Sequence, residues 1–186
     1  EIGEVADTAT VLFWIGMPVM RPEKFHVRVQ RVNTIYRAEM AIRPGAHFID
    51  YHDAAVRVLA QGFVDLKMLA GSVDSVIEQG TYKRFYMHRT GHWLGMDVHD
   101  AGEYRARNEG HDASGQEWRV LEAGMVLTVE PGCYVRPADD VPEAFWNIGI
   151  RIEDDVLVTA DGCDIYTVDT PKTVADIEAV MAEART

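Results

Sequence analysis

Histidines gather in one short stretch of the chain, between Met87 and Asp100. It holds three of the seven histidines, His88, His92 and His99, interleaved with apolar residues and glycines. A solvated surface run does not alternate imidazoles with Trp, Leu, Met and Val, whereas a strand or tight loop lining a half-buried cleft does. An imidazole there can bind a metal ion or carry a proton, because its unperturbed pKa lies near neutrality. The alternative, three core histidines each satisfied by a hydrogen bond, is the less favoured interpretation.

Two glutamates follow on apolar segments that have the composition of strands. Glu130 comes directly after residues 126–129 and before a Pro-Gly pair, and Glu153 lies within residues 148–159, two positions from Arg151. A buried carboxylate is costly unless it is paired or metal-bound, so pairing with Arg151 and metal binding are both open. Two carboxylates and an imidazole form a mixed oxygen and nitrogen site, which suits Mn²⁺, Co²⁺, Zn²⁺ or Fe²⁺. Glutamates that bridge two ions would indicate a hydrolase with a metal-activated water.

The composition narrows the classes of protein to consider. A chain of 186 residues with 47% hydrophobic residues is expected to form one domain with a proper core. No apolar run is long enough to span a bilayer, and the acidic start of the chain is unlike a signal peptide. A net charge of −12 argues against a nucleic-acid partner. Two cysteines, without CxxC spacing, fit a reducing cytoplasm rather than a disulfide framework.

Helices are expected in the first half of the chain. Apolar residues recur at three- and four-residue steps in residues 27–42 and again in residues 49–69. A shorter helix is predicted from Ser72, its N-cap, to about Gly80. Before these helices, residues 11–15 are β-branched and aromatic, which predicts a strand.

The second half predicts antiparallel strands and a final helix. Residues 84–87 and 164–168 are expected to be short strands, and residues 126–135 a strand that is bent or bulged after Glu130. In residues 148–159, Ile148, Ile150 and Ile152 share one face while Gly149, Arg151 and Glu153 share the other. Residues 101–119, including His111, predict an exposed loop, and Asp161-Gly162 a hairpin turn. The last helix should run from Thr173 to Ala184, with Val174, Ile177 and Met181 facing inward. This order of elements is an α+β fold.

Three segments resemble the metallopeptidases of the pita-bread fold, and most closely the bacterial Xaa-Pro aminopeptidases (aminopeptidase P). They are HRTGHWLGMDVHDAGEY (88–104), LEAGMVLTVEPGCYV (121–135) and GIRIEDDVLVT (149–159). Trp93 and the run Val141-Pro142-Glu143 favour aminopeptidase P over prolidase within that group. The resemblance extends from about Arg43 to the end of the chain.

This resemblance implies a dinuclear metal site. His92 corresponds to the histidine ligand of one ion, Glu130 to a glutamate ligand, and Glu153 to the carboxylate that bridges both ions. It implies two divalent metal ions, usually Mn²⁺, with Co²⁺, Zn²⁺ or Fe²⁺ as possible substitutes. It also implies peptide substrates with proline in second position, from which the N-terminal residue is released.

Further roles follow from the same resemblance. His88 corresponds to a histidine near the substrate and the bridging hydroxide, and His99 to one that contacts the substrate carbonyl. Arg151 corresponds to an arginine of the polar network around the site. Glu130 is the expected proton shuttle from water to the proline nitrogen.

The first residues of the chain depart from the family pattern. The family has two aspartate ligands upstream, one of them in a motif Asp-x-Thr-Arg, and the nearest match here is Asp7-Thr8-Ala9-Thr10. We therefore expect a single partial catalytic domain over residues 1–186, incomplete in its N-terminal half and divergent or rearranged in residues 1–31. The alternatives are a non-catalytic peptide-binding module on this fold and a prolidase-like dipeptidase. Self-association is expected because a partial domain would expose apolar surface.

Overall fold

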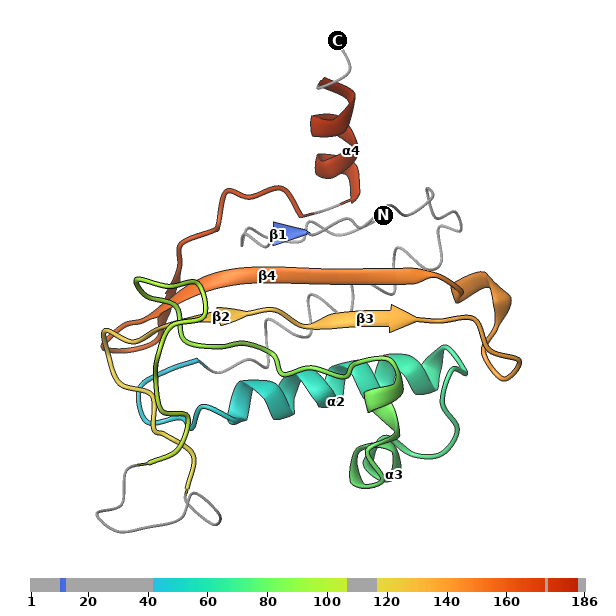
Figure 1. Ribbon diagram of the computed structural model, residues 1–186, viewed down its shortest axis with the longest axis horizontal. Helices are drawn as coiled ribbons and strands as arrows, with labels where there is room; N and C mark the ends of the chain where they lie inside the picture. The colour runs from blue at the N-terminus through green and yellow to red at the C-terminus, as the bar shows by residue number, and fades with distance from the viewer. Residues whose placement is uncertain (1–10, 13–41, 107–116, 173, 184–186) are drawn as a thin grey trace.

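The computed structural model describes residues 11–12, 42–106, 117–172 and 174–183. Its strands form one layer, helices lie against that layer, and the last helix leads away from it (Figure 1). The helices are α2 (Asp50–Asp65), α3 (Val73–Glu78) and α4 (Val174–Glu183), with 3-10 turns η1 (Thr81–Arg84) and η2 (Glu143–Phe145). The strands are β1 (Val11–Leu12), β2 (Val126–Val129), β3 (Gly132–Val135), β4 (Ile148–Val158) and β5 (Cys163–Ile165). The predicted α+β class is confirmed.

Strand β4 is the centre of the sheet, because the other four described strands all pair with it in antiparallel register. β2 and β3 follow one another along one edge of β4, and β1 lies along the opposite edge. Val129 faces Asp154 before the break between β2 and β3, and Gly132 faces Arg151 after it. The register is therefore unchanged across the break, which contains no inserted residue. The predicted interruption after Glu130 is confirmed, but it is not a bulge, and one backbone hydrogen bond crosses it, from the Ile152 N–H to the Pro131 carbonyl (3.2 Å).

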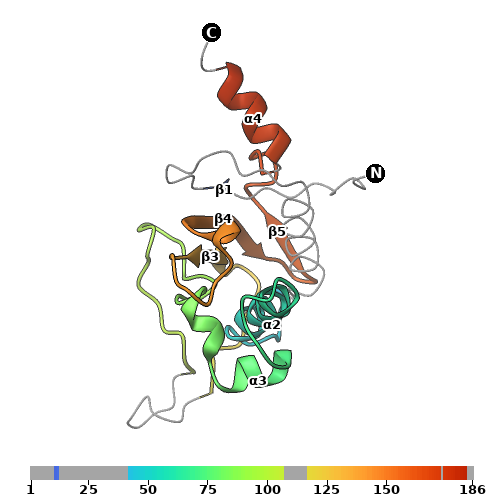
Figure 2. The ribbon, with the colours of Figure 1, turned by 90° about the vertical axis from the view of Figure 1, so that its right-hand side faces the viewer.

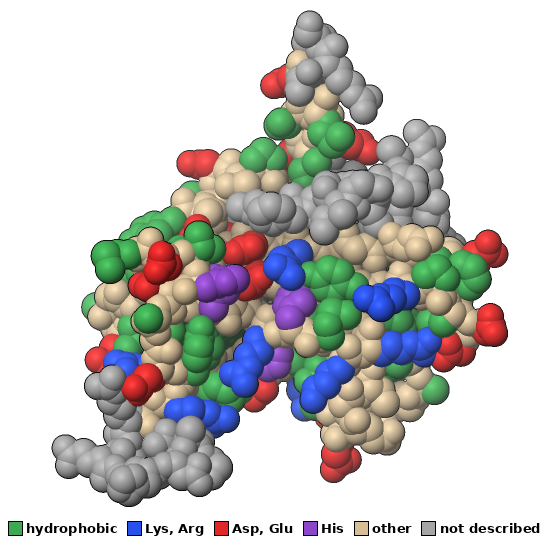
Figure 3. Space-filling model, viewed as in Figure 1, with side chains coloured by type: hydrophobic (Ala, Val, Ile, Leu, Met, Phe, Trp, Pro, Cys, Tyr) green, Lys and Arg blue, Asp and Glu red, His purple; other side chains and the backbone are tan. Residues whose placement is uncertain are grey.

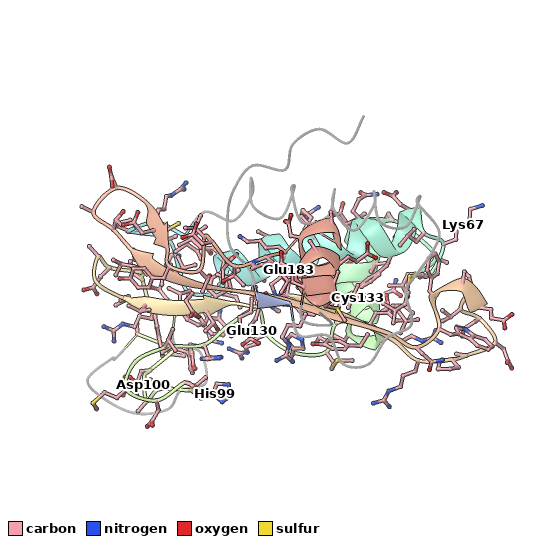
Figure 4. The ribbon with its side chains drawn as sticks, turned by 90° about the horizontal axis from the view of Figure 1, so that it is seen from above. Lys67, His99, Asp100, Glu130, Cys133 and Glu183 are labelled. Carbon is pink, nitrogen blue, oxygen red and sulfur yellow. The ribbon has the colours of Figure 1, made fainter. Side chains whose placement is uncertain are left out.

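The two faces of the sheet have different characters, because successive side chains on a strand point to opposite sides. One face of β2, β3 and β4 is apolar and packs against α2. The other face carries Thr128, Glu130, Tyr134, Arg151 and Glu153. Viewed from above, α2 lies on one side of the sheet, and the loop with His99 and Asp100 lies on the other (Figure 4).

Helix α2 joins two groups of buried side chains. The α2–β3 cluster packs against one part of the helix, and the α2–β2 cluster against another. The α2–β3 cluster contains Val56, Leu59, Ala60, Phe63, Met68, Val76, Tyr82, Phe85, Tyr86, Val135, Val141 and Ile148. The α2–β2 cluster contains Ile42, Ala46, Phe48, Tyr51, Ala55, Val58, Trp93, Leu121, Leu127, Val129, Val156 and Val158.

Several predicted helix boundaries hold. The Ser72 side chain accepts a hydrogen bond from the Ser75 N–H, as expected of an N-cap. Helix α2 was expected to reach Leu69 but ends at Asp65, because Lys67 takes a left-handed conformation with φ 58°.

None of the helices in the described ranges combines the length and apolar character that crossing a bilayer requires.

Other predictions are wrong in their details. Residues 84–87 are not a strand: η1 ends at Arg84, and the buried residues Phe85 and Tyr86 form no strand, although the Phe85 carbonyl accepts from the Tyr134 N–H of β3 (2.8 Å). The strand expected at 164–168 is β5, which begins one residue earlier and ends at Ile165. The loop expected at 101–119 is paired near its two ends, where Arg105 and Trp118 form an antiparallel β-bridge.

The last helix also differs from its prediction. Met181 was expected to face inward, but 47% of its surface is exposed. Helix α4 projects from the other described elements (Figure 2). Some predictions fall outside the described residues. These are the helix expected at residues 27–42, except for its last residue, and the part of the 11–15 strand beyond Leu12. The residues Asp7, His111 and Thr173 also lie outside.

Candidate metal centre

The gap between β2 and β3 places two carboxylates side by side. The register makes Glu130 the residue opposite Glu153 on β4. Opposed residues on neighbouring strands point to the same face and have Cβ atoms about 5 Å apart. Glu130 is 8% exposed, so this pair lies in the protein rather than on a solvated rim.

His92 completes the group from a separate segment. The segment lies along β2: the His92 carbonyl accepts from the Thr128 N–H (2.9 Å), the His92 N–H donates to Thr128 Oγ1 (3.1 Å), and the Leu94 N–H donates to the Val126 carbonyl (3.1 Å). His92, Glu130 and Glu153 each offer an atom, and these atoms all lie within 4.8 Å of one another. The three residues predicted as metal ligands are therefore neighbours in space.

The orientation of the His92 ring suits metal binding. Its Nδ1 lies 2.9 Å from the Trp93 carbonyl, which can only accept, so Nδ1 carries the proton. Nε2 lies 3.3 Å from Glu130 Oε1 and is the ring nitrogen that a metal ion would bind. A backbone carbonyl that fixes the tautomer in this way is the usual partner of a metal-ligating histidine.

The electrostatics of the group also fit a cation. Burial raises the pKa of Glu153, and the nearby carboxylates of Glu130 and Asp155 raise it further. A lone pair on His92 and two carboxylates that face each other are acceptors without enough donors between them. A divalent cation would neutralise them, so the residues present fit the metal implied by the sequence.

Arg151 holds the other side of Glu130. Its Nη1 lies 3.2 Å from Glu130 Oε2, and its Nε donates to the Tyr134 hydroxyl at 2.9 Å. An ion pair with Arg151 and metal binding by the glutamates are therefore compatible. Arg151 pairs with one oxygen of Glu130, and Glu130 and Glu153 still lie beside His92.

His88 connects to the same network through Tyr134. Its Nδ1 lies 2.7 Å from the Arg89 carbonyl and so carries the proton, which leaves Nε2 to accept from the Tyr134 hydroxyl at 3.0 Å. Burial lowers the pKa of His88, which favours the neutral ring.

Sequence reasoning missed Tyr134, although a signal was available. It lies four residues after Glu130, so an unbroken alternation places both on one face of the strand. Gly132 lies between them, and a Cβ there would come within 2.6 Å of the Tyr134 hydroxyl. The glycine thus makes room for the tyrosine beside Arg151.

His99 lies on the solvent side of His92. The two rings meet edge to face, with centroids 4.1 Å apart, and His99 is exposed. Its loop is closed by a hydrogen bond from the Asp100 N–H to the Trp93 carbonyl (3.1 Å). In the space-filling view, histidine side chains reach the surface in the middle of this face, next to acidic side chains (Figure 3). His99 therefore lies where a bound ligand would meet the site.

Comparisons with known proteins agree with this geometry. The chain matches metallopeptidase family M24 over residues 3–160. It is 48% identical to the Xaa-Pro aminopeptidase of Haemophilus influenzae over 145 residues, which cover 78% of this chain and 32% of the relative. The chain thus spans about a third of the length of the curated relatives it matches.

Solved structures give the same result. The structure of Pseudomonas aeruginosa aminopeptidase PepP matches with a TM-score of 0.75 at 49% identity, over 89% of this chain and 36% of that one. Aminopeptidase P from E. coli with the inhibitor Pro-Leu matches with a TM-score of 0.73 at 38% identity, over 87% of this chain and 35% of that one. The chain therefore belongs to metallopeptidase family M24 and has the pita-bread fold of the aminopeptidases P.

Proposed function

We propose that this chain carries part of the active site of a metal-dependent aminopeptidase, which releases the N-terminal residue from peptides with proline in second position. The observation that supports it most is the cluster of His92, Glu130 and Glu153, whose ligand atoms lie within 4.8 Å of one another. The names of the related Xaa-Pro aminopeptidases support the choice of substrate.

In this proposal, the three clustered residues would supply three of the ligands of a site for two divalent ions, of which Mn²⁺ is the first choice. When bound, such ions polarise a water molecule and lower its pKa toward neutrality. The tautomer of His92, fixed by the Trp93 carbonyl, keeps Nε2 available as a ligand. Glu153, with its raised pKa, gains most from a neighbouring cation.

The chain's own groups then move the protons. Glu130 takes a proton from the water and delivers it to the nitrogen of the peptide bond that breaks, while the water oxygen bonds to the carbonyl carbon. Arg151 stabilises Glu130 as an anion, because its guanidinium lies 3.2 Å from one carboxylate oxygen. His99 donates a hydrogen bond to the substrate carbonyl oxygen, and His88, which contacts Tyr134, lies near the substrate.

The decisive experiment measures metal content and cleavage on one sample. The chain is loaded with Mn²⁺, its bound metal is counted by elemental analysis, and hydrolysis of an Xaa-Pro-Xaa tripeptide is followed. We expect metal binding and proline-dependent cleavage, with both lost in Glu153→Gln. The isosteric control Glu122→Gln, at an exposed glutamate outside the cluster, should retain both.

The other outcomes separate the alternatives. Metal binding without cleavage would favour a non-catalytic peptide-binding module on the same fold. Cleavage of Xaa-Pro dipeptides but not tripeptides would favour a prolidase-like dipeptidase. Absence of both metal and cleavage would overturn the proposal.

The remaining expectations stay predictions. The charge of −12 is the reason to expect no nucleic-acid partner. Self-association is supported by exposed apolar side chains such as Met96, Val98 and Val180, and sedimentation velocity would test it. A cytoplasmic location rests on the cysteine content alone.

A further inference from the structure

A second polar network lies behind the metal cluster and contains none of its ligands. His52 of α2 places its Nδ1 2.9 Å from Thr90 Oγ1, and the Tyr86 hydroxyl lies 2.5 Å from the same oxygen. Thr90 and Tyr86 are 0% exposed. A polar network this deep is stabilising only when every member finds a partner.

The donors and acceptors of this network balance when the neutral His52 ring carries its proton on Nε2. A threonine hydroxyl has one proton to donate and can accept another. The arrangement in which Tyr86 donates to Thr90, and Thr90 donates to His52 Nδ1, leaves each of the three groups satisfied. Burial, and to a smaller extent the positive charge of Arg89, lower the pKa of His52 to about 4, so its ring is neutral near pH 7. In the tautomer with the proton on Nε2, Nδ1 is the acceptor.

Thr90 links this network to the metal cluster through the backbone. Its carbonyl accepts from the Glu130 N–H, and His92 follows it by two residues. Between them, Gly91 lies so close to β2 that a Cβ there would come within 1.8 Å of the Thr128 carbonyl. The backbone therefore fixes this segment against β2, whereas the Thr90 side chain fixes it against α2.

We propose that His52 is a positioning residue of the metal centre: through the Thr90 hydroxyl, it sets where His92 and Glu130 meet. This inference rests on the proposed function, because it assigns His52 to the support of the ligands proposed there. His52 touches no ligand atom itself. Its effect is on how well the two ligands are placed for a cation, and hence on metal affinity.

Two substitutions of His52 test this role. His52→Phe keeps a ring of similar size but removes the acceptor, whereas His52→Asn keeps an acceptor close to the place of Nδ1. The control is Val56→Ala, one turn further along α2, which removes buried apolar volume in the α2–β3 cluster but no hydrogen-bonding group. For each variant of the 186-residue chain, Mn²⁺ affinity is measured by titration calorimetry and the Tm is measured without metal.

We expect His52→Phe to weaken Mn²⁺ binding about 10-fold, the lower end of what outer-shell partners contribute. His52→Asn should recover most of that loss, and Val56→Ala should lower the Tm while leaving the affinity unchanged. Thr90→Val, which removes the hydroxyl at constant shape, should reproduce the loss if His52→Phe does not fold.

Unchanged affinity in both His52→Phe and Thr90→Val would overturn the inference. So would an equal loss of affinity in Val56→Ala, because the effect would then follow general stability. A wild-type chain that binds no Mn²⁺ would overturn the proposed function first, and the role of His52 with it.

Discussion

At the scale of single residues, the metal centre depends on how closely one segment approaches β2. Gly91 permits that approach, since a Cβ at this position would come within 1.8 Å of the Thr128 carbonyl oxygen and 2.7 Å of its carbon. Backbone atoms in a paired strand cannot move aside as a flexible side chain can. The requirement for glycine here is therefore one of space.

Gly91→Ala should lower the free energy of unfolding by about 3 kcal/mol, the upper end of the cost of overpacking. Denaturation in urea would measure it. The matched control is Gly162→Ala, where the added Cβ meets only Thr159 Oγ1 at 4.0 Å, and stability should be unchanged or slightly raised. Equal effects at the two glycines would contradict the steric argument.

Replacing a buried tyrosine with phenylalanine should change the free energy of unfolding in opposite directions at Tyr86 and Tyr51. The Tyr86 hydroxyl is bonded to Thr90, whereas no residue in the described ranges provides a partner for the buried Tyr51 hydroxyl. Removing a bonded hydroxyl costs about 1 kcal/mol, and removing an unsatisfied one relieves a desolvation penalty of similar size. Tyr86→Phe should therefore lower the free energy of unfolding and Tyr51→Phe should raise it. A loss in both variants, measured by chemical denaturation, would mean that the Tyr51 hydroxyl has a partner.

The residues with distinctive chemistry were predictable from the sequence, and those that support them were not. His92, Glu130 and Glu153 stand out as polar groups in apolar segments, and the structure brings them together. His52 and Thr90 are 38 residues apart and belong to no motif, so their contact depends on how α2 packs on the sheet. Tyr134 was within reach of the alternation rule, but its partner Arg151 is on another strand.

At the scale of elements, β4 places two carboxylates on the face of the site. Glu153 and Asp155 point to this face, whereas Asp154 points to the other face and accepts a hydrogen bond from the Thr167 hydroxyl. The pKa values of Glu153 and Asp155 are raised, in both cases chiefly by burial. In the metal-free chain, ionised Glu153 therefore opposes folding.

This predicts that metal binding reverses which of two proteins, the wild type or Glu153→Gln, is the more stable. A carboxyl whose folded pKa is raised adds stability below its ordinary pKa of 4.5, and that stability is lost as the pH rises through the folded value. Without metal, Glu153→Gln should be more stable than the wild type at pH 7, with a difference that vanishes toward pH 4.5. With Mn²⁺ at about 100 times its Kd, the wild type should gain about 2.7 kcal/mol and become the more stable of the two.

Thermal unfolding at pH 7 and pH 4.5, with and without Mn²⁺, would test both parts. Glu122→Gln serves again as the isosteric control, because Glu122 is exposed and lies outside the cluster. A metal-free Glu153→Gln variant less stable than the wild type at pH 7 would contradict the role of burial.

The elements were predictable where periodicity was strong. The alternation in residues 148–159 indicated β4 and both of its faces, and the Pro-Gly pair indicated the gap after Glu130. The run at 84–87 misled because aromatic residues suit a strand, yet Phe85 and Tyr86 fill the α2–β3 cluster from an irregular segment. Local propensity cannot distinguish burial in a sheet from burial beside a helix.

At the scale of the whole molecule, α2 and β4 each run through both hydrophobic clusters. Val56 and Phe63 of α2 lie in the α2–β3 cluster, while Tyr51 and Val58 lie in the α2–β2 cluster. The metal centre lies where β2 gives way to β3, between the parts of the sheet that cover the two clusters. Which strands meet in this way could not be predicted, since it depends on pairing between residues far apart in the sequence.

Because two elements are shared, the clusters should unfold together. Phe63→Ala, in the α2–β3 cluster, should cost about 3–5 kcal/mol and reduce the hydrogen-exchange protection of β2 amides as much as that of β3 amides. Val98→Ala, at a side chain 69% exposed, should change neither. Loss of protection confined to β3 would show that the two clusters open separately.

The indole of Trp93, next to the proposed ligand His92, should make the fluorescence of the chain sensitive to a bound metal ion. Trp93 is 9% exposed, stacks on Tyr104 with an angle of 10° between the rings, and its carbonyl accepts a hydrogen bond from His92 Nδ1. A paramagnetic ion such as Mn²⁺ held by His92 would be bound by the residue next to this fluorophore. The chain has four tryptophans, so partial quenching of the emission, absent in Trp93→Phe, would report metal occupancy without an added dye.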